Sequence, residues 1–291
     1  MSWMSWLLVV VGTLAVAAAG VASVGSLRWP ATVRPLANRL EAARVDQAAW
    51  ATGTHRYDPR ELVRLPAPVQ RYFRAALAEG QPMVAAVSFT TAGTFNQSST
   101  EEKWRPFTSR QRVITRRPGF LWDARISLLP GLQVRVLDSY MAGSGQLRAA
   151  VAGLFTVADM HGEGDIARGE FMRFFAEAPW YPTALLPSQG VVWAPVDDRS
   201  ALATMRDGPL ALTLLFRFGG DGFVESVRAE ARGGLVDGKT VMMPWECSMS
   251  AYTRRDGMWV PGTGEAAWIR AGGRKAYFRG ALTSLAFELA R

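Results

Sequence analysis

The sequence predicts a mainly β protein of the α+β class, built on one large, strongly curved antiparallel sheet that is half-barrel-like. A helical lid and an N-terminal helical region complete this predicted fold. From Val84 onward, apolar and polar residues alternate with a period of two, the pattern of strands with one buried face. Short Gly-rich turns separate these stretches, as in antiparallel hairpins, and no strand–helix–strand rhythm appears. At 291 residues and 49% hydrophobic content, the chain can bury a large core.

Residues 1–27 form an apolar segment without a charged residue after Met1. About 20 apolar residues suffice to cross a bilayer as a helix, so we expect a transmembrane anchor at residues 6–27. Trp3, Trp6 and Trp29 flank this stretch, where indole rings favour lipid headgroups. A cleaved signal segment is the alternative, because the alanines at 17–19 suit a cleavage site, although the basic region that usually precedes such a segment is missing.

Residues 28–60 are expected to form a basic connector. Residues 28–74 hold nine arginines against four acidic residues, whereas the remaining excess of this +8 chain is spread thinly. Arginines after the apolar segment and none before it favour a single-pass protein whose domain faces the cytoplasm. The thin distribution elsewhere lacks the basic face of a nucleic-acid-binding protein, so no nucleic-acid partner is expected.

Residues 61–291 are predicted to form the curved β domain. Its first helix is expected near residues 61–78, where apolar residues recur every three or four positions. Pro66 and Pro68 interrupt that pattern, which predicts a kinked or two-part helix. Further on, Phe120, Trp122, Ala124 and Ile126 alternate with their neighbours as one face of a strand.

The segment 169–188 departs most from ordinary composition. It predicts a helix near residues 169–178 that ends at Pro179, followed by a stretch too apolar for a surface loop. We interpret it as a helix and aromatic lid laid on the concave face of the sheet. Helical spacing gives the segment an aromatic face and a polar stripe. These are Phe171, Phe174 and Phe175 on one side and Glu170, Arg173 and Glu177 on the other.

The common catalytic motifs do not occur. Two histidines and Cys247 lie far apart, which argues against a metal site, and no cofactor is expected. The Gly-Ser-Gly at 143–145 lacks the pattern of a hydrolase nucleophile elbow. The Gly-Thr-Gly at 262–264 imitates a dinucleotide fingerprint but lies between strands instead of opening a helix.

The candidate ligand-binding residues are charged or aromatic and fall within apolar neighbourhoods. Burial would raise the pKa values of such carboxyls and create an acid–base pair, whereas pairing with neighbouring arginines would make them structural. Arg173 is the expected cation for a ligand headgroup, held by carboxylates one turn away on either side. For the aromatic residues, plain core packing is the favoured alternative to a ligand pocket. The set comprises Trp122, Asp138, Glu170, Arg173, Glu177, Trp180 and Tyr181.

Four stretches of the chain carry a resemblance: LPAPVQRYFRAAL (65–77), residues 119–148, residues 169–188 and residues 244–268. Together they resemble an uncharacterised bacterial family, a domain of unknown function that commonly follows a membrane segment and has an R-x-x-x-E-x-x-W-[YF]-P-T-A-L-L-P core. The resemblance implies that Arg173, Glu177 and Trp180 match the family motif. By analogy of fold alone, a curved sheet with a helical lid is similar to bacterial lipoprotein carriers, which hold acyl chains.

Three functions stay open from the sequence. The first is a membrane-associated protein, anchored through residues 6–27, that binds an apolar or amphiphilic, lipid-like ligand in the concavity of its sheet. The second is an enzyme acting on a lipid-like substrate with Glu177 or Asp138 as acid or base. The third is a purely structural domain. Ligand identity, oligomeric state and the presence of any catalysis do not follow from these residues.

Overall fold

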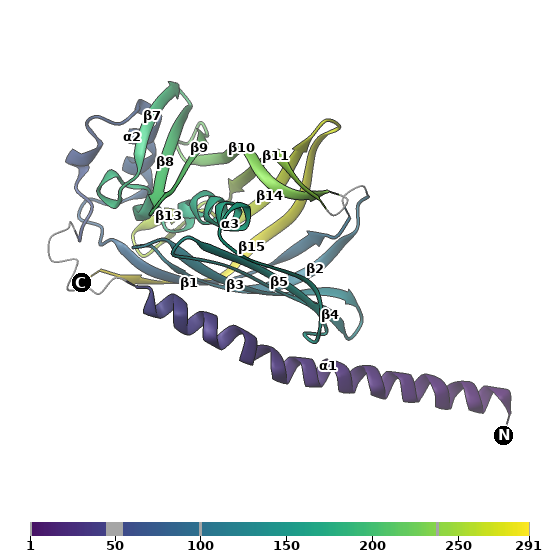
Figure 1. The fold of residues 1–291 in the computed structure, drawn as a ribbon. Helices are drawn as coiled ribbons and strands as arrows, with labels where there is room; N and C mark the ends of the chain where they lie inside the picture. The colour runs from purple at the N-terminus through teal and green to yellow at the C-terminus, as the bar shows by residue number, and fades with distance from the viewer. Residues whose placement is uncertain (1, 45–54, 99–100, 237–238, 291) are drawn as a thin grey trace.

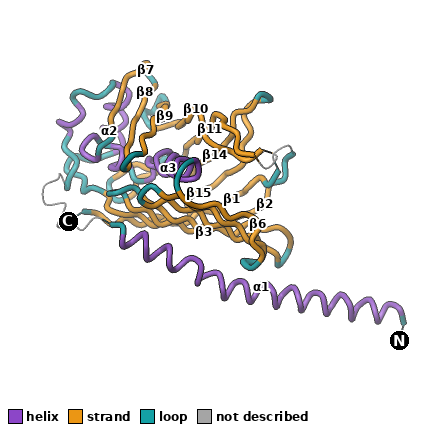
Figure 2. Tube along the Cα trace, viewed as in Figure 1, coloured by secondary structure: helices purple, strands orange, loops and turns teal. Residues whose placement is uncertain are grey.

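The computed structural model describes residues 2–44, 55–98, 101–236 and 239–290, without the side chains at positions 14, 15, 17, 18, 235 and 236. A large sheet curves around one helix on its inner side, while a long helix lies against its outer side (Figure 1). Coloured by secondary structure, the chain is mostly strand once it enters the sheet (Figure 2). Residues 45–54 of the predicted connector fall outside the described residues.

The described strands form one open antiparallel sheet of thirteen and a separate hairpin, β12–β13. Neighbours in the large sheet follow the order β6-β5-β4-β3-β2-β1-β15-β14-β11-β10-β9-β8-β7. The C-terminal strand β15 therefore pairs with β1 in the middle of the sheet. The predicted curved antiparallel fold is confirmed. The strands are β1 (Val84–Asn96), β2 (Trp104–Ile114), β3 (Gly119–Leu129), β4 (Leu132–Met141), β5 (Ser144–Val151), β6 (Phe155–Gly162), β7 (Val192–Asp197), β8 (Ser200–Asp207), β9 (Leu210–Phe218), β10 (Val224–Val236), β11 (Lys239–Ser250), β12 (Thr253–Arg255), β13 (Met258–Val260), β14 (Thr263–Arg270) and β15 (Gly273–Leu289).

The two-residue period of β3 sorts its side chains between two different cores. Phe120, Trp122 and Ala124 point into the concavity and are at most 3% exposed. Leu121, one position out of phase, joins a second apolar cluster on the outer face of the sheet. Because both faces of this part of the sheet are covered, its strands carry apolar residues at both phases.

Helix α3 (Asp165–Ala176) lies inside the curve of the sheet, as Figure 1 shows. Its aromatic face is fully buried, with the Phe171 ring stacked on Tyr140 of β4 at 4.9 Å between centroids. Beyond its C-cap at Glu177, the chain continues through three short 3₁₀ helices, at Ala178–Trp180, Pro182–Leu185 and Pro187–Gln189. Pro179 cannot continue an α-helix, and its fixed φ suits the first turn of the next one.

Helix α1 (Trp3–Ala42) is continuous through residue 27, so the expected boundary between anchor and connector is not a break in the helix. Its C-terminal part packs on the outer face of the sheet through Trp29, Leu36 and Leu40. The Trp29 indole Nε1 also donates a hydrogen bond to Asp123 of β3 at 2.8 Å. Residues assigned to a connector from their charge are therefore a third layer of the domain.

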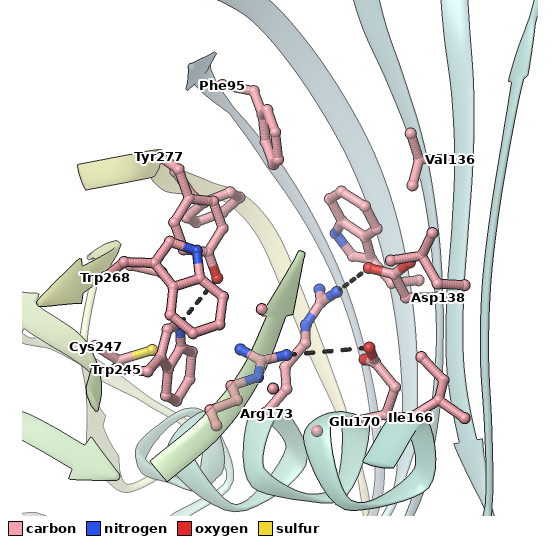
Figure 3. A pocket seen from close by; sticks show the side chains of 18 of the residues that line it. Phe95, Val136, Asp138, Ile166, Glu170, Arg173, Trp245, Cys247, Trp268 and Tyr277 are labelled. Carbon is pink, nitrogen blue, oxygen red and sulfur yellow. Dashed lines mark hydrogen bonds and ion pairs between the residues drawn. The ribbon is translucent and has the colours of Figure 1, made fainter. Parts of the chain in front are cut away.

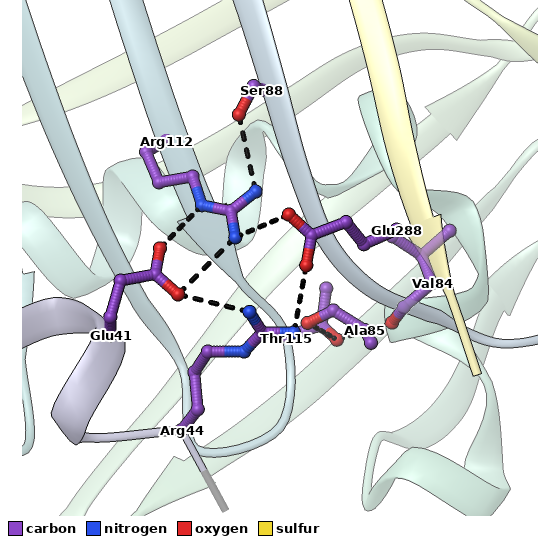
Figure 4. Close-up of polar contacts among 8 residues, drawn as sticks. All are labelled: Glu41, Arg44, Val84, Ala85, Ser88, Arg112, Thr115 and Glu288. Carbon is purple, nitrogen blue, oxygen red and sulfur yellow. Dashed lines mark hydrogen bonds and ion pairs between the residues drawn. The ribbon is translucent and has the colours of Figure 1, made fainter. Parts of the chain in front are cut away.

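The end of α1 is fixed by an ion-pair network with two strands (Figure 4). Arg112 of β2 contacts both Glu41 and Glu288 at 2.7 Å. Arg44 reaches the same two carboxylates at 3.0 Å. At the other end of the contact, Gly25 approaches the sheet so closely that a Cβ there would lie 1.7 Å from the Ala152 carbonyl oxygen. Helix α1 is thus held on the sheet at both ends of its contact.

The predicted helix near residues 61–78 consists of two parts, as the prolines indicated. A 3₁₀ helix at Pro59–Leu62 is capped by the Asp58 carboxylate, and α2 (Ala67–Ala76) follows. Across the described residues, no helix is both long and apolar enough to cross a membrane.

Candidate functional site

A cavity of about 870 Å³ lies between α3 and the concave face of the sheet. This volume is within the range of pockets that hold small molecules, about 300–1,000 Å³. Strands from both arms of the sheet contribute to its walls, so the cavity depends on the whole curve (Figure 3). Its main lining residues are Phe95, Trp122, Val136, Asp138, Leu147, Ile166, Glu170, Arg173, Glu177, Trp180, Arg232, Trp245, Cys247, Ala266, Trp268 and Tyr277.

Six of the seven residues singled out from the sequence line this cavity. They come from two regions of the chain: Trp122 and Asp138 are paired across the β3–β4 hairpin, and Glu170, Arg173, Glu177 and Trp180 belong to α3 and the turn after it. Tyr181 does not join them. Its side chain is fully buried, and its hydroxyl donates to the Phe174 carbonyl at 2.5 Å. Tyr181 therefore belongs to the core that supports α3.

The polar stripe of α3 faces the cavity while its phenylalanines face the core. Helical periodicity predicted both faces, and the structure decides which of them meets the open space. Trp180 adds to the cavity wall, and its indole Nε1 is satisfied by the Pro261 carbonyl at 2.8 Å. That indole lies close to Gly264 of β14, where an added Cβ would be 3.0 Å from the ring.

Arg173 is at the centre of a group of charged residues, with Asp138, Glu170 and Glu177, that we call the floor of the cavity. Its Nε donates to Glu177 at 2.8 Å, its Nη1 to Asp138 at 2.6 Å and its Nη2 to Gln111 at 3.2 Å. The guanidinium also lies 4.5 Å from the ring centroid of Trp122. All three nitrogens are thus engaged within the protein. Arg173, the cation expected to meet a ligand headgroup, therefore already makes three hydrogen bonds within the protein.

Burial and mutual charge shift the pKa values of this cluster. Burial alone would lower the pKa of Arg173, but the carboxylates of Glu177 and Asp138 raise it, so this guanidinium stays charged. Burial raises the pKa of Asp138, an effect that its ion pair with Arg173 opposes. Burial and the nearby Asp138 raise the pKa of Glu170 to about 8. Glu170 is therefore largely a neutral acid at pH 7.

Arg232 of β10 is the second cation of the cavity, and sequence reasoning missed it. Its Nη2 lies 4.0 Å from Glu170 Oε1. Its guanidinium lies 4.3 Å from the ring centroid of Trp245 and 5.9 Å from that of Trp268. Contact with aromatic faces attracts a cation without using its hydrogen-bond donors.

One sequence signal could have revealed this site: Arg232 precedes Gly233 and Gly234 inside a strand. Glycine in a strand interior often marks close approach of another group. At Gly234, a Cβ would lie 2.7 Å from the Met243 methyl and 3.0 Å from the Trp268 ring. Gly234 thus leaves room for Trp268 of the aromatic wall beside Arg232.

The opposite wall is aromatic and internally bonded. The Trp245 indole donates to the Tyr277 hydroxyl at 2.9 Å, and the Tyr277 ring packs against both Trp268 and Phe95. Cys247 is buried behind them, and burial raises the pKa of its thiol. Two carboxyl oxygens on the floor, Asp138 Oδ1 and Glu170 Oε2, have no hydrogen-bond partner among the described residues. The site therefore combines apolar walls with a polar floor.

The described residues contain no group of three or more histidine, cysteine or acidic side chains placed to hold a metal ion. Comparison with known protein families matches residues 63–287 to the Family of unknown function (DUF6920). The chain belongs to this family. A search of the curated proteins found no match. The DUF6920 region includes α2 and α3 and extends from β1 into β15, so it contains every cavity residue named above, whereas α1 precedes it.

Proposed function

We propose that this DUF6920 protein is membrane-associated and binds the apolar part of an amphiphilic, lipid-like molecule in its cavity. The observation that carries the proposal is the combination of a cavity of about 870 Å³, aromatic walls and a charged floor beneath them. Sites for small molecules have this composition: mostly apolar lining with a few placed polar groups.

The energetics of burial favour an alkyl chain as the occupant. Each buried methylene contributes about 0.8 kcal/mol, so eight of them offer about 6 kcal/mol before ordering costs are subtracted. Trp122, Val136, Leu147 and Trp268 supply the apolar surface for such a chain. A wholly polar ligand would leave these walls without a partner.

The polar end of the ligand would meet Arg232 rather than Arg173. Each guanidinium nitrogen of Arg173 already donates one hydrogen bond, to Glu177, Asp138 or Gln111, whereas Arg232 contacts aromatic faces and stands 4.0 Å from Glu170. An anionic or strongly polar headgroup could approach Arg232 without dismantling an ion pair at hydrogen-bond distance.

Membrane association through residues 6–27 is part of the proposal. The first half of α1 has nine large apolar side chains between Trp3 and Val16, which are 51–77% exposed. Exposed apolar surface of this extent is unusual for a protein in water. Lipid would cover it, and no charged residue from Ser2 to Leu27 opposes that burial.

The binding proposal is tested by filling the cavity. Val136→Trp places an indole where Val136 lines the cavity, whereas Val196→Trp adds the same group to an exposed position of β7. Full-length protein in detergent is titrated with an anthroyloxy-labelled fatty acid and a labelled phospholipid. Wild type and Val196→Trp should bind one of them saturably, and Val136→Trp should not. Equal binding by both variants would mean that the lipid binds outside the cavity. Absence of saturable binding by wild type would refute the proposal.

An enzyme acting on a lipid-like substrate is a second candidate, and one observation favours it. Glu170 lines the cavity as a neutral acid with a pKa raised to about 8, which suits proton donation near neutral pH. Asp138 and Glu177, the acid or base expected from the sequence, are both paired with Arg173. Release of fatty acid from ester lipids by wild type, lost in Glu170→Gln with lipid binding retained, would support catalysis; absence of turnover would remove it.

A further inference from the structure

Six hairpins of the large sheet have their connected strand ends at the same end, one of them the β8–β9 pair next to the sheet margin. The other five are the described strand ends of β1 and β2, β3 and β4, β5 and β6, β10 and β11, and β14 and β15, which share this end because neighbouring strands are antiparallel. We call this end of the sheet the rim. It includes the strand ends at residues 95–98, 103–105, 128–132, 151–157, 239–242 and 270–275.

Helix α1 leaves the sheet at the rim. Gly25 lies against Ala152 and Leu154 of the β5–β6 turn, and the ion-pair network of Glu41 marks the opposite end of the contact. The helix continues past the rim toward its N-terminus, as Figure 1 shows. Residues 3–24 form this projecting part, which at 1.5 Å per residue is about 33 Å long, close to the thickness of a bilayer core.

The rim combines exposed apolar side chains with lysine. Leu129 and Phe155 are each 61% exposed, and Val241 and Met242 are 41% and 48% exposed. All three lysines of the chain, at positions 103, 239 and 275, also lie here. Apolar side chains for the interface and cations for anionic headgroups are the two components of a membrane-surface contact.

The cavity extends to the same end. In the interior the cavity is lined by Arg173, Glu177 and Trp180. At the rim it is lined by Gln97, Thr240 and Lys275. An opening at the rim would therefore face whatever surface the rim touches.

We propose that the rim rests on the surface of an anionic bilayer in which residues 3–24 are embedded, so that the cavity opens directly onto lipid. This inference rests on the proposed function and names the docking surface and its orientation. The anchor and the rim reach the same plane, because α1 leaves the sheet where the exposed apolar side chains and the lysines lie. A ligand would pass from the bilayer into the cavity without crossing water.

Depth measurements test this orientation on the full-length protein. Single cysteines at Leu129 or Phe155 of the rim, and at Asp198 in the β7–β8 turn at the far end of the sheet, take an environment-sensitive fluorophore. Cys247 is retained, because its thiol is buried and poorly reactive. In vesicles of phosphatidylcholine and phosphatidylserine, headgroup-proximal spin-labelled lipid should quench the rim labels several-fold more than the Asp198 label. Equal quenching at the two ends would overturn the proposal.

Charge reversal tests the choice of partner. Lys103→Glu with Lys239→Glu should weaken quenching at the rim about fivefold per reversed charge in these vesicles, and little in phosphatidylcholine alone. Arg254→Glu with Arg255→Glu, on exposed β12 at the far end, is the matched control and should change nothing. If the reversal has no effect, or if a soluble protein protects the rim labels from lipid quenching, the bilayer is not the partner.

The same samples separate the two proposals. Lipid found in the cavity of a protein whose rim labels stay in water contradicts the rim inference and leaves the binding proposal standing. Rim labels quenched by lipid while the cavity stays empty contradict the binding proposal instead, and with it the purpose assigned to the rim.

Discussion

At the scale of single residues, Arg173 is the buried charge whose desolvation must be offset by its ion pairs. The attraction within a buried ion pair offsets its desolvation only when the geometry is good and further hydrogen bonds support the charges. Arg173 bonds Asp138 and Glu177 at 2.6 and 2.8 Å, and Gln111 adds a third hydrogen bond. The cluster is thereby a rigid floor, with carboxylates fixed at defined positions below the apolar walls. Its energetic role is structural, even though its position is that of a ligand-binding group.

Arg173→Ala should destabilise the fold by about 3–5 kcal/mol, because it strands two buried carboxyls without their counter-ion. Arg254→Ala, at an exposed position of β12, should change stability by less than about 0.5 kcal/mol. Chemical denaturation of the two variants in the same detergent measures the difference. Equal midpoints would mean that the Arg173 cluster is solvated.

Glu170 should make the protein less stable at alkaline pH. Its pKa is raised on folding to about 8 from 4.5, so the folded state holds a proton that the unfolded state releases. The stability from this proton is complete below pH 4.5 and is lost as the pH rises through about 8, roughly 3 kcal/mol between pH 5.5 and 9. Denaturation midpoints should fall over that range in wild type and much less in Glu170→Gln; an identical slope in both would refute the assignment to Glu170.

At the scale of secondary-structure elements, the charge pattern of residues 28–60 did not predict that α1 packs on the sheet. The sequence assigns residues 28–60 to a basic connector, yet Trp29, Leu36 and Leu40 pack on the sheet. The arginines of α1 are compatible with this packing because they occupy its other faces. The available signal was in the strands: Leu121 and Leu137 are apolar at the phase that should face water.

The contact at Gly25 gives α1 a sharp test. Replacing Gly by Ala inside a helix normally stabilises it by about 1 kcal/mol. Gly20→Ala should show that gain, since no atom lies within 4 Å of the added Cβ. Gly25→Ala should instead loosen α1 from the sheet, because its Cβ would lie 1.7 Å from the Ala152 carbonyl oxygen. Faster proteolysis between α1 and the sheet in Gly25→Ala, and not in Gly20→Ala, is the expected result; equal proteolysis would contradict the packing.

Hydrophobic periodicity predicted part of the cavity lining but not all of it. The 3.6-residue period of α3 separates Glu170 and Arg173 from Phe171 and Phe174, and the structure places these groups on different sides. Periodicity is silent about which strands meet across the curve, so Arg232 and Trp245, on a different arm of the sheet, were missed. Tyr181 was assigned to the lid because the segment after Pro179 is rich in aromatic and apolar residues, and the structure places its hydroxyl in a hydrogen bond inside the core.

At the scale of the whole molecule, the curvature of the sheet determines how the cavity, α3 and α1 are arranged. Thirteen strands bend around α3 and leave a cavity beside the packed core, and α1 packs on the outer face while projecting beyond the rim. A domain with a purely structural role would gain stability by filling such a space, since voids cost packing energy. The cavity, its charged floor and the exposed apolar half of α1 are the features on which the proposed lipid-like ligand and membrane association rest.

Native mass spectrometry of the full-length protein, extracted from its own membrane in mild detergent, tests the central claim most directly. Wild type and Val196→Trp should retain one lipid-sized adduct that dissociates as a single class of molecule, and Val136→Trp should lack it. Bare protein in all three samples, or an adduct that persists when Val136→Trp fills the cavity, would contradict a lipid-binding function for this site.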